Sequence, residues 1–191
     1  MKFRDDAYYI RQVLGGNASA YRNLVEKHQD LVYTIVHRIV TRAEEAEEVA
    51  QDVFVKAYQK LSDFKAEAKF STWLYRIAYN HAVSHTRKKK IDFLAMDEDM
   101  IENHGEVETK QEIMGLTLDE QGELLKTALG NLPRTDNLII SLYYYHAKDL
   151  EEISEIVGLT QNNVKVKLFR IRKKLLKEMK VLLNKNINTV A

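Results

Sequence analysis

Apolar residues recur at steps of three and four positions over almost the whole chain, which is the spacing of one face of an α-helix. Leu24, Leu31 and Ile35 mark one such face. Period-two alternation is scarce, and the chain holds one proline and seven glycines. The pattern predicts an all-α fold, with helices expected near residues 7–14, 24–39, 46–61, 70–82, 118–129, 133–146, 149–157 and 161–183.

The helical pattern weakens in the middle of the chain. Acidic residues dominate from Asp97 to Glu112, where the apolar periodicity is poor. We therefore predict two small helical domains, at residues 1–90 and 118–191, joined by a flexible linker at residues 91–117.

The last part of the second domain has the spacing of a helix-turn-helix. Asp149 and Glu152 form a capping pair that would start a short helix, and Gly158 permits the turn after it. The helix that follows begins with side chains suited to base edges, namely Gln161, Asn162, Asn163 and Lys165. Further along are cations suited to phosphates, namely Lys167, Arg170, Arg172, Lys173 and Lys174. A solvated lysine-rich helix is the alternative, which the turn glycine and the polar first turn disfavour.

Charge is segregated along the chain although the formal net charge is only +1. Residues 44–52 hold five acidic side chains and no cation, whereas residues 161–180 are strongly basic. This separation predicts an acidic surface and basic surfaces that serve different partners. A second basic stretch interleaves cations with aromatics from Lys69 to Lys90.

Composition argues against several classes of protein. There is no cysteine, so disulfides, thiolate metal sites and cysteine nucleophiles are excluded. We see no glycine-rich phosphate loop and no acid–base constellation, and we predict a protein that is not an enzyme and needs no cofactor. His81 and His85 stand one helical turn apart, but no third ligand is evident, so a metal site is not expected. No apolar run reaches membrane-spanning length and the first residues are not a signal peptide, which predicts a cytoplasmic protein.

Two sequence motifs carry a resemblance to a known family. The segments Glu45–Leu61 and Phe70–Asn80 closely resemble region 2 of the extracytoplasmic-function sigma factors of bacterial RNA polymerase, in the sigma-70 family. Leu132-Pro133 and the segment Val164–Arg172 resemble region 4 of the same family. The motifs occur in the expected order, which makes the resemblance specific.

The resemblance implies a docking surface for core RNA polymerase. Glu48, Gln51 and Asp52 match the family's surface for the β′ coiled coil. The acidic side of this predicted helix suits a basic partner, although its periodicity alone would equally fit an ordinary solvated face.

The resemblance also implies a surface that captures an extruded base of the minus-ten element. Phe64 and Asn80 match the capture site, with Lys60 at its edge. An aromatic ring and an amide can hold an unstacked base by stacking and edge hydrogen bonds. Cations expected to follow the DNA backbone are Lys65, Lys69, Arg76, Arg87 and Lys88. We expect Trp73 to pack in the core rather than to stack on a base.

In region 4 the resemblance implies that Lys165, Phe169 and Arg170 contact the minus-thirty-five element. Val166 stands where the family usually has a small polar residue. It can contact a thymine methyl group, or it can lie outside the residues that read bases. The consecutive tyrosines Tyr143, Tyr144 and Tyr145 point in different directions on a helix, and we expect them to pack in the core and at its boundary.

The sequence thus predicts an initiation factor that binds core RNA polymerase through its β′ coiled coil and β subunit. The predicted factor recognises both promoter elements, as duplex and as non-template single strand, promotes DNA opening and is controlled by an anti-sigma factor. The main alternative is a helix-turn-helix regulator that acts without core polymerase. A helical adaptor with an incidental basic tail is a third reading. The regulator reading leaves the acidic helix and the Phe70–Asn80 motif unexplained.

Overall fold

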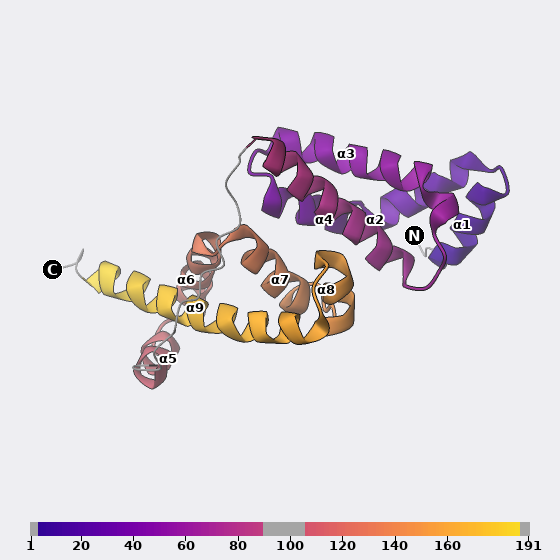
Figure 1. The fold of residues 1–191 in the computed structure, drawn as a ribbon. Helices are drawn as coiled ribbons and strands as arrows, with labels where there is room; N and C mark the ends of the chain where they lie inside the picture. The colour runs from indigo at the N-terminus through magenta and orange to yellow at the C-terminus, as the bar shows by residue number, and fades with distance from the viewer. Residues whose placement is uncertain (1–3, 90–105, 188–191) are drawn as a thin grey trace. The chain divides into compact units, whose positions relative to one another are not determined.

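The computed structural model describes residues 4–89 and 106–187, and all regular elements in these ranges are helical (Figure 1). The all-α prediction is therefore confirmed. The α-helices are α1 (Asp6–Leu14), α2 (Tyr21–Ile39), α3 (Ala43–Gln59), α4 (Phe70–Lys89), α5 (Glu106–Met114), α6 (Leu118–Asn131), α7 (Arg134–Tyr144), α8 (Leu150–Val157) and α9 (Gln161–Ile187). Two short 3-10 helices are η1 (Ala18–Ala20) and η2 (Leu61–Asp63). Most of the predicted linker lies outside the described residues, and its last part contains α5.

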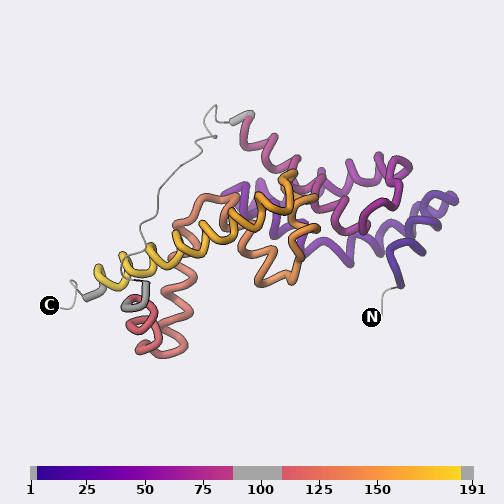
Figure 2. Tube along the Cα trace, turned by 60° about the horizontal axis from the view of Figure 1, so that its bottom comes forward, coloured from indigo at the N-terminus to yellow at the C-terminus, as the bar shows by residue number. Residues whose placement is uncertain are grey.

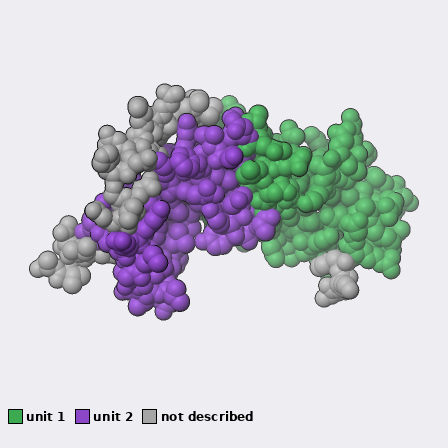
Figure 3. Space-filling view, turned by 90° about the horizontal axis from the view of Figure 1, so that it is seen from below, with its two compact units in different colours: residues 1–93, 148–161 green, residues 94–147, 162–191 purple. Residues whose placement is uncertain are grey.

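The chain divides into two compact units, which Figure 3 shows in different colours. The first comprises residues 1–93 and 148–161, and the second comprises residues 94–147 and 162–191. The first unit therefore carries α1–α4 and α8, and the second carries α5–α7 and α9. The domain boundaries expected from the sequence stay a prediction.

Helices α2, α3 and α4 pack together and form the core of the first unit (Figure 1). The apolar positions that repeat every three or four residues are the ones that become buried, as an amphipathic helix requires. Fully or almost fully buried side chains include Leu24, Val32 and Ile35 of α2, Ala46 and Val53 of α3, and Leu74 and Ala78 of α4. The faces left exposed by this packing are where the candidate sites lie.

A buried hydrogen-bond network ties α1, α2 and α4 together. His28 is 6% exposed, and its Nδ1 lies 3.1 Å from the Tyr75 hydroxyl while its Nε2 lies 3.1 Å from Asp6 Oδ2. Lys27 Nζ donates to Asp6 Oδ1 at 2.7 Å. Burial by itself would raise the pKa of Asp6, but the hydrogen bonds from His28 and Lys27 outweigh burial and hold that pKa below 3.8.

In the second unit, a small apolar cluster joins α6 to the C-terminal half of α9. Leu124 and Ala128 of α6 are buried with Met179 and Leu183 of α9. Helix α9 is continuous from Gln161 to Ile187, so this half is a direct extension of the basic first turns (Figure 2). The cluster therefore anchors the C-terminal half of α9 within the second unit.

Helix α6 begins at a capping box that the periodicity of the sequence did not reveal. The Glu120 backbone N–H donates to Thr117 Oγ1 at 3.3 Å, and the Thr117 N–H donates to Glu120 Oε2 at 2.8 Å. Pro133 is the N-cap of α7 rather than a residue of its first turn. The capping box satisfies backbone N–H groups at the start of α6 that would otherwise lack partners, whereas Pro133 provides no side-chain hydrogen bond to the start of α7.

The capping pair predicted at the start of α8 is confirmed. Asp149 Oδ1 accepts from the Glu152 N–H at 2.8 Å, and Glu152 Oε2 accepts from the Asp149 N–H at 3.4 Å. Gly158 ends α8 in the left-handed conformation, with φ of 72°, as expected for the turn glycine. The helix, turn and helix order predicted for residues 149–183 is therefore present.

Candidate docking and nucleic-acid interfaces

The exposed face of α3 carries the residues predicted to dock core polymerase. Glu48, Gln51 and Asp52 are all exposed, and their spacing of three and four places them on one side of the helix. Val55 continues this side and is 55% exposed. The structure thus brings the three predicted residues together on an accessible acidic face with one apolar position.

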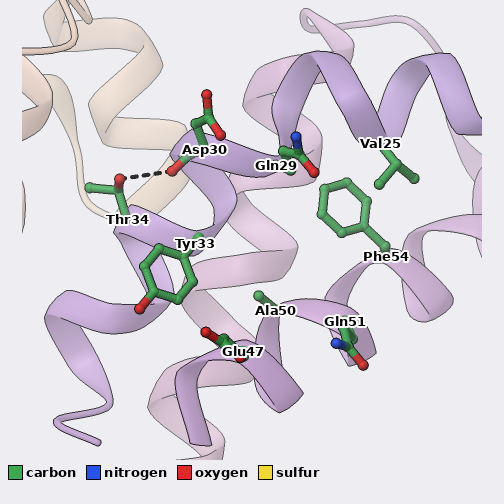
Figure 4. A pocket seen from close by; sticks show the side chains of 9 residues that line it. All are labelled: Val25, Gln29, Asp30, Tyr33, Thr34, Glu47, Ala50, Gln51 and Phe54. Atoms are coloured by element: carbon green, nitrogen blue, oxygen red, sulfur yellow. Dashed lines mark hydrogen bonds between the residues drawn. The ribbon is translucent and has the colours of Figure 1, made fainter. Parts of the chain in front are cut away.

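A groove between α2 and α3 borders the acidic face (Figure 4). Its volume is about 540 Å³. Figure 4 shows the rings of Tyr33 from α2 and Phe54 from α3 along this groove, with Gln51 nearby. Gln51 therefore belongs both to the acidic face and to the groove, which gives a partner an apolar recess beside charged groups.

Two histidines of α4 border the acidic face on its other side. His81 Nε2 lies 3.7 Å from Asp52 Oδ2, and His85 Nε2 lies 3.7 Å from Glu45 Oε2. Lys56 Nζ lies 2.7 Å from His81 Nδ1. Because an ammonium group only donates, Nδ1 accepts here, which places the proton of a neutral His81 on Nε2, facing Asp52.

The environment of His81 disfavours its charged form. Burial, followed by the positive charge of Lys56, lowers the pKa of His81 below 6.5, against the opposing pull of Asp52. Among the described residues, no group of three or more histidine, aspartate or glutamate side chains is arranged to hold a metal ion.

A stripe of polar and aromatic side chains follows one face of α4. Arg76, Asn80 and Arg87 are exposed and spaced by four and seven residues. Trp73 precedes them by three, so all four share a side of the helix. Lys60 is exposed at the start of the connection that leads from α3 to α4, and Lys65 is exposed near the middle of it. The side chain of Lys88 lies outside the described residues.

Phe64 lies in an aromatic cluster at the start of this stripe. Its ring centroid is 5.3 Å from that of Trp73 and 5.6 Å from that of Phe70. Phe70 is buried, whereas Phe64 and Trp73 are half-buried. Asn80 is seven residues beyond Trp73, which is about 10 Å along the helix axis. Phe64 and Asn80 are thus two separate points on one face.

Lys69 also lies on this side of the helix start but is engaged within the first unit. Its ammonium is 3.1 Å from Glu152 Oε1, and Lys148 Nζ is 3.2 Å from the same oxygen. The carboxylate raises the pKa of Lys69, chiefly through this hydrogen bond. Sequence patterns gave no sign that this cation would have an acidic partner so far along the chain.

The residues predicted to read the minus-thirty-five element form the exposed face of α9. Val164, Leu168 and Ile171 are buried on one side of the helix. On exposed positions lie Gln161, Asn162, Asn163, Lys165, Val166, Phe169 and Arg170. Val166 and Phe169 are 41% and 54% exposed, so this face presents amides in the first turn, followed by Lys165, the apolar pair and Arg170.

Other cations of α9 are held by the second unit itself. Lys167 Nζ lies 2.7 Å from Asp136 Oδ1, and Lys174 Nζ lies 3.9 Å from Asp136 Oδ2. Arg172 Nε donates to the Tyr144 hydroxyl at 2.8 Å. The expectation that all these cations face phosphates is therefore not supported for Lys167 and Lys174.

The tyrosines that end α7 line a second groove. Its volume is about 660 Å³, and its walls come from α5, α6, α7 and α9 with mainly apolar side chains, including Leu125, Leu129, Ile140, Leu175 and Met179. Tyr144 and Tyr145 line it and are 56% and 60% exposed. The prediction that the three tyrosines pack in the core and at its boundary was thus wrong for Tyr144 and Tyr145, which are exposed because α7 ends here and its last turn faces the groove.

Comparison with known proteins identifies the family. The chain matches the family model Sigma-70 region 2 over residues 24–91 and the model Sigma-70, region 4 over residues 122–175. It is 33% identical over 178 residues to the ECF RNA polymerase sigma factor SigW of Bacillus subtilis (strain 168), which covers 90% of this chain and 95% of that protein. The chain belongs to the extracytoplasmic-function sigma factors of the sigma-70 family.

One further relative and two solved structures of similar fold were also found. The RNA polymerase sigma-H factor of Pseudomonas aeruginosa is 29% identical over 184 residues, covering 93% of this chain and 95% of that protein. The solved structure of CnrH in complex with the cytosolic domain of CnrY has a TM-score of 0.63 at 23% identity and covers 94% of this chain and 97% of that chain. The sigma factor RpoE in complex with the anti-sigma factor NepR from Bartonella quintana has a TM-score of 0.60 at 21% identity, covering 84% and 97%.

As a sigma factor of this family, the protein binds core RNA polymerase, recognises promoter DNA and promotes its opening for transcription initiation. The predicted main function is thus confirmed, and nothing found favours a regulator that acts without core polymerase. In the described part of the chain, no helix has both the length and the apolar character needed to cross a membrane.

Proposed function

We propose that this sigma factor divides its work among three exposed helix faces, on α3, α4 and α9. The observation that carries the proposal is that each face has a different chemistry. The face of α3 is acidic, that of α4 combines aromatic rings with cations, and that of α9 combines amides, an apolar pair and cations. Each composition suits a different partner: a basic protein helix, an unstacked strand and a duplex groove.

The acidic face of α3 is the proposed docking surface for the β′ coiled coil of core polymerase. Asp52 is central to it, because its carboxylate is 68% exposed and lies between Glu48 and the edge formed by His81. Carboxylates that stay accessible beside an apolar recess can pair with cations of a partner helix while Val55 and Phe54 are covered. This arrangement supports docking of a helix that carries both basic and apolar side chains.

Charge reversal tests this surface. Asp52→Lys should weaken binding of the sigma factor to core polymerase on the order of tenfold or more, because an attractive pair becomes a repulsive one. Glu123→Lys on α6 is the matched control, since Glu123 is an exposed acid outside the proposed surface. Equal core affinity of the two variants in a fluorescence titration would remove Asp52 from the interface.

The stripe on α4 is the proposed site for the non-template strand of the minus-ten element. Phe64 is held by Trp73 and Phe70, so it offers a ring whose orientation is already fixed and costs little entropy on stacking. The exposed amide of Asn80 can pair with the edge of an extruded base. Arg76 and Arg87 lie on the same side and can neutralise phosphates of the strand.

The exposed face of α9 is the proposed reader of the duplex minus-thirty-five element. Asn162, Lys165 and Arg170 offer hydrogen bonds to base edges and phosphates, while Val166 and Phe169 offer apolar contacts. These side chains lie on one side of α9, and the opposite side of the helix is buried in the protein. A helix that enters a major groove needs this arrangement.

The groove lined by Tyr144 and Tyr145 is the proposed docking site for a helix of the polymerase β subunit. Its apolar walls and exposed aromatic rings favour a protein partner over solvent. An anti-sigma factor is proposed to hold the protein inactive, a role supported by the similar sigma factor RpoE, which was solved in complex with the anti-sigma factor NepR. We further propose that the protein acts in the cytoplasm and catalyses no reaction itself.

A direct test of the whole proposal is transcription by core polymerase on a library of random promoters. The sigma factor should enrich templates with two conserved elements and should co-elute with core polymerase at low micromolar concentration. A protein that bound duplex as a dimer and started no transcripts would contradict the proposal.

A further inference from the structure

The cations of α9 fall into two sets that differ in what they face. Lys165 and Arg170 are exposed and have no ion-pair partner among the described residues. Lys167 and Lys174, two helical turns apart, converge on one carboxylate, that of Asp136 on α7. The second set lies on the flank of α9 between the exposed face and the buried positions Val164 and Leu168, by helical geometry.

The burial of Asp136 makes this pairing a strong constraint. Asp136 is 5% exposed, and a buried carboxylate without a partner is costly. The two lysines keep 36% and 28% of their side chains exposed, so the cost of separating the groups falls mainly on the aspartate. Asp136 is also the third residue of α7, where the helix dipole stabilises a negative charge. The buried carboxylate of Asp136 therefore keeps both lysines paired with it, because it has little access to solvent water as an alternative partner.

The pairing of these lysines with Asp136 affects the sequence-independent affinity of α9 for DNA. Each cation that neutralises a phosphate releases counterions, so the slope of log K against log salt concentration becomes steeper by about 0.9 per contact. Phosphate contacts raise affinity for every sequence alike, whereas base contacts raise it for the right one. Cations that are paired within the protein contribute little to the affinity that comes from phosphate contacts.

We propose that Asp136 is a positioning residue that withdraws Lys167 and Lys174 from DNA and so limits the sequence-independent affinity of region 4. The inference rests on the proposed role of α9 as the duplex reader. It assigns phosphate contact to Arg170, and contact with bases or phosphates to Lys165. It also assigns Lys167 and Lys174 to holding α9 on α7.

The test uses the full chain assembled with core polymerase and a duplex of unrelated sequence, titrated at several potassium chloride concentrations. Asp136→Asn frees both lysines, so the affinity for this duplex should rise at low salt and the slope should steepen by about 1 to 2. A purely structural role for Asp136 would lower affinity or leave the slope unchanged, and either result overturns the proposal. Thermal unfolding of the variant shows whether it is folded.

Lysine variants keep the proposal testable if Asp136→Asn does not fold. The double variant Lys167→Gln with Lys174→Gln should leave the slope unchanged, whereas Arg170→Gln should flatten it by about 0.9. A flattening by the double variant as large as that of Arg170→Gln would show that the lysines already contact phosphates. No flattening by Arg170→Gln or by Lys165→Gln would instead contradict the role of α9 itself, and the inference with it.

Discussion

Two helices of this protein are rich in basic residues, but the structure gives their side chains different surroundings. On α4, the cations Arg76 and Arg87 share one exposed side with Trp73 and Asn80. On α9, two of the cations, Lys167 and Lys174, pair with Asp136 and lie beside the exposed face rather than on it. The number of cations on a helix therefore overstates the positive charge that is available to DNA. How many of them are available depends on the acidic side chains of neighbouring helices that pair with them.

The aromatic side chains at the two helices also have different surroundings. Phe64 and Trp73 support one another beside α4, whereas Phe169 of α9 is 54% exposed with Lys173 Nζ 4.9 Å from its ring centroid. A ring braced by other rings suits stacking on an unpaired base, and a solitary exposed ring suits contact with the floor of a groove.

The largest effect that would sharpen this comparison is expected from Phe64→Ala. Stacking on an aromatic side chain contributes about 1–3 kcal/mol per base, so promoter opening should fall roughly 5- to 150-fold. Binding of closed promoter duplex should change little. Stopped-flow fluorescence of a base analogue in the minus-ten element measures opening.

The matched variant for Phe64→Ala is Phe169→Ala on α9. It should weaken duplex binding and leave the rate of opening from the bound state nearly unchanged. If both variants slow opening alike, the division between the two helices is wrong.

The next effect concerns the stability of the helix that precedes α9. Asp149→Ala removes the N-cap of α8 and should lower the free energy of unfolding by about 1 kcal/mol. Thr117→Ala removes the equivalent cap of α6 and should cost a similar amount. Urea denaturation followed by circular dichroism measures both. A cost near zero for Asp149→Ala, with a normal cost for Thr117→Ala, would mean that the cap of α8 does not stabilise the protein.

A smaller effect is expected where Val166 meets the duplex. If Val166 contacts a thymine methyl group, replacing that thymine by uracil removes about 0.8 kcal/mol of apolar contact, or roughly fourfold in affinity. Val166→Ser should be insensitive to the same replacement. Competition binding with thymine and uracil duplexes measures the difference. Equal sensitivity of the two proteins would place Val166 outside the base-reading residues.

The smallest expected effect is on stability against pH. Because burial and Lys56 lower the pKa of His81, the unfolded chain binds a proton more readily, and stability should decline as pH falls through about 6.5. The lowered pKa of Asp6 predicts a second decline as pH falls through about 3.8. Urea midpoints from pH 8 to pH 5 test the first decline.

His81→Gln should reduce the decline near pH 6.5, with His37→Gln, at an exposed position, as the control. If the midpoint of His81→Gln declines near pH 6.5 more steeply than that of the unchanged protein, His81 is stabilised, rather than destabilised, in its charged form.

Much of the fold could be predicted from local sequence because helix periodicity, the Asp149–Glu152 cap and the Gly158 turn are local signals. The site residues on α3, α4 and α9 could be proposed from motifs, and helical spacing alone puts each set on one face. The pairings of Asp136 with Lys167 and of Lys69 with Glu152 could not, because they join residues distant in the chain. The exposure of Tyr144 and Tyr145 depends on where α7 ends, which periodicity does not fix.

The most direct test of the central claim is permanganate footprinting of promoter complexes formed by core polymerase with this sigma factor. The account predicts reactive thymines in the minus-ten element with the unchanged protein. With Asn80→Ala it predicts complexes that still bind the promoter, measured by filter retention, but lack the reactive thymines. A normal bubble with Asn80→Ala, or loss of promoter binding together with the bubble, would contradict the assignment of opening to α4.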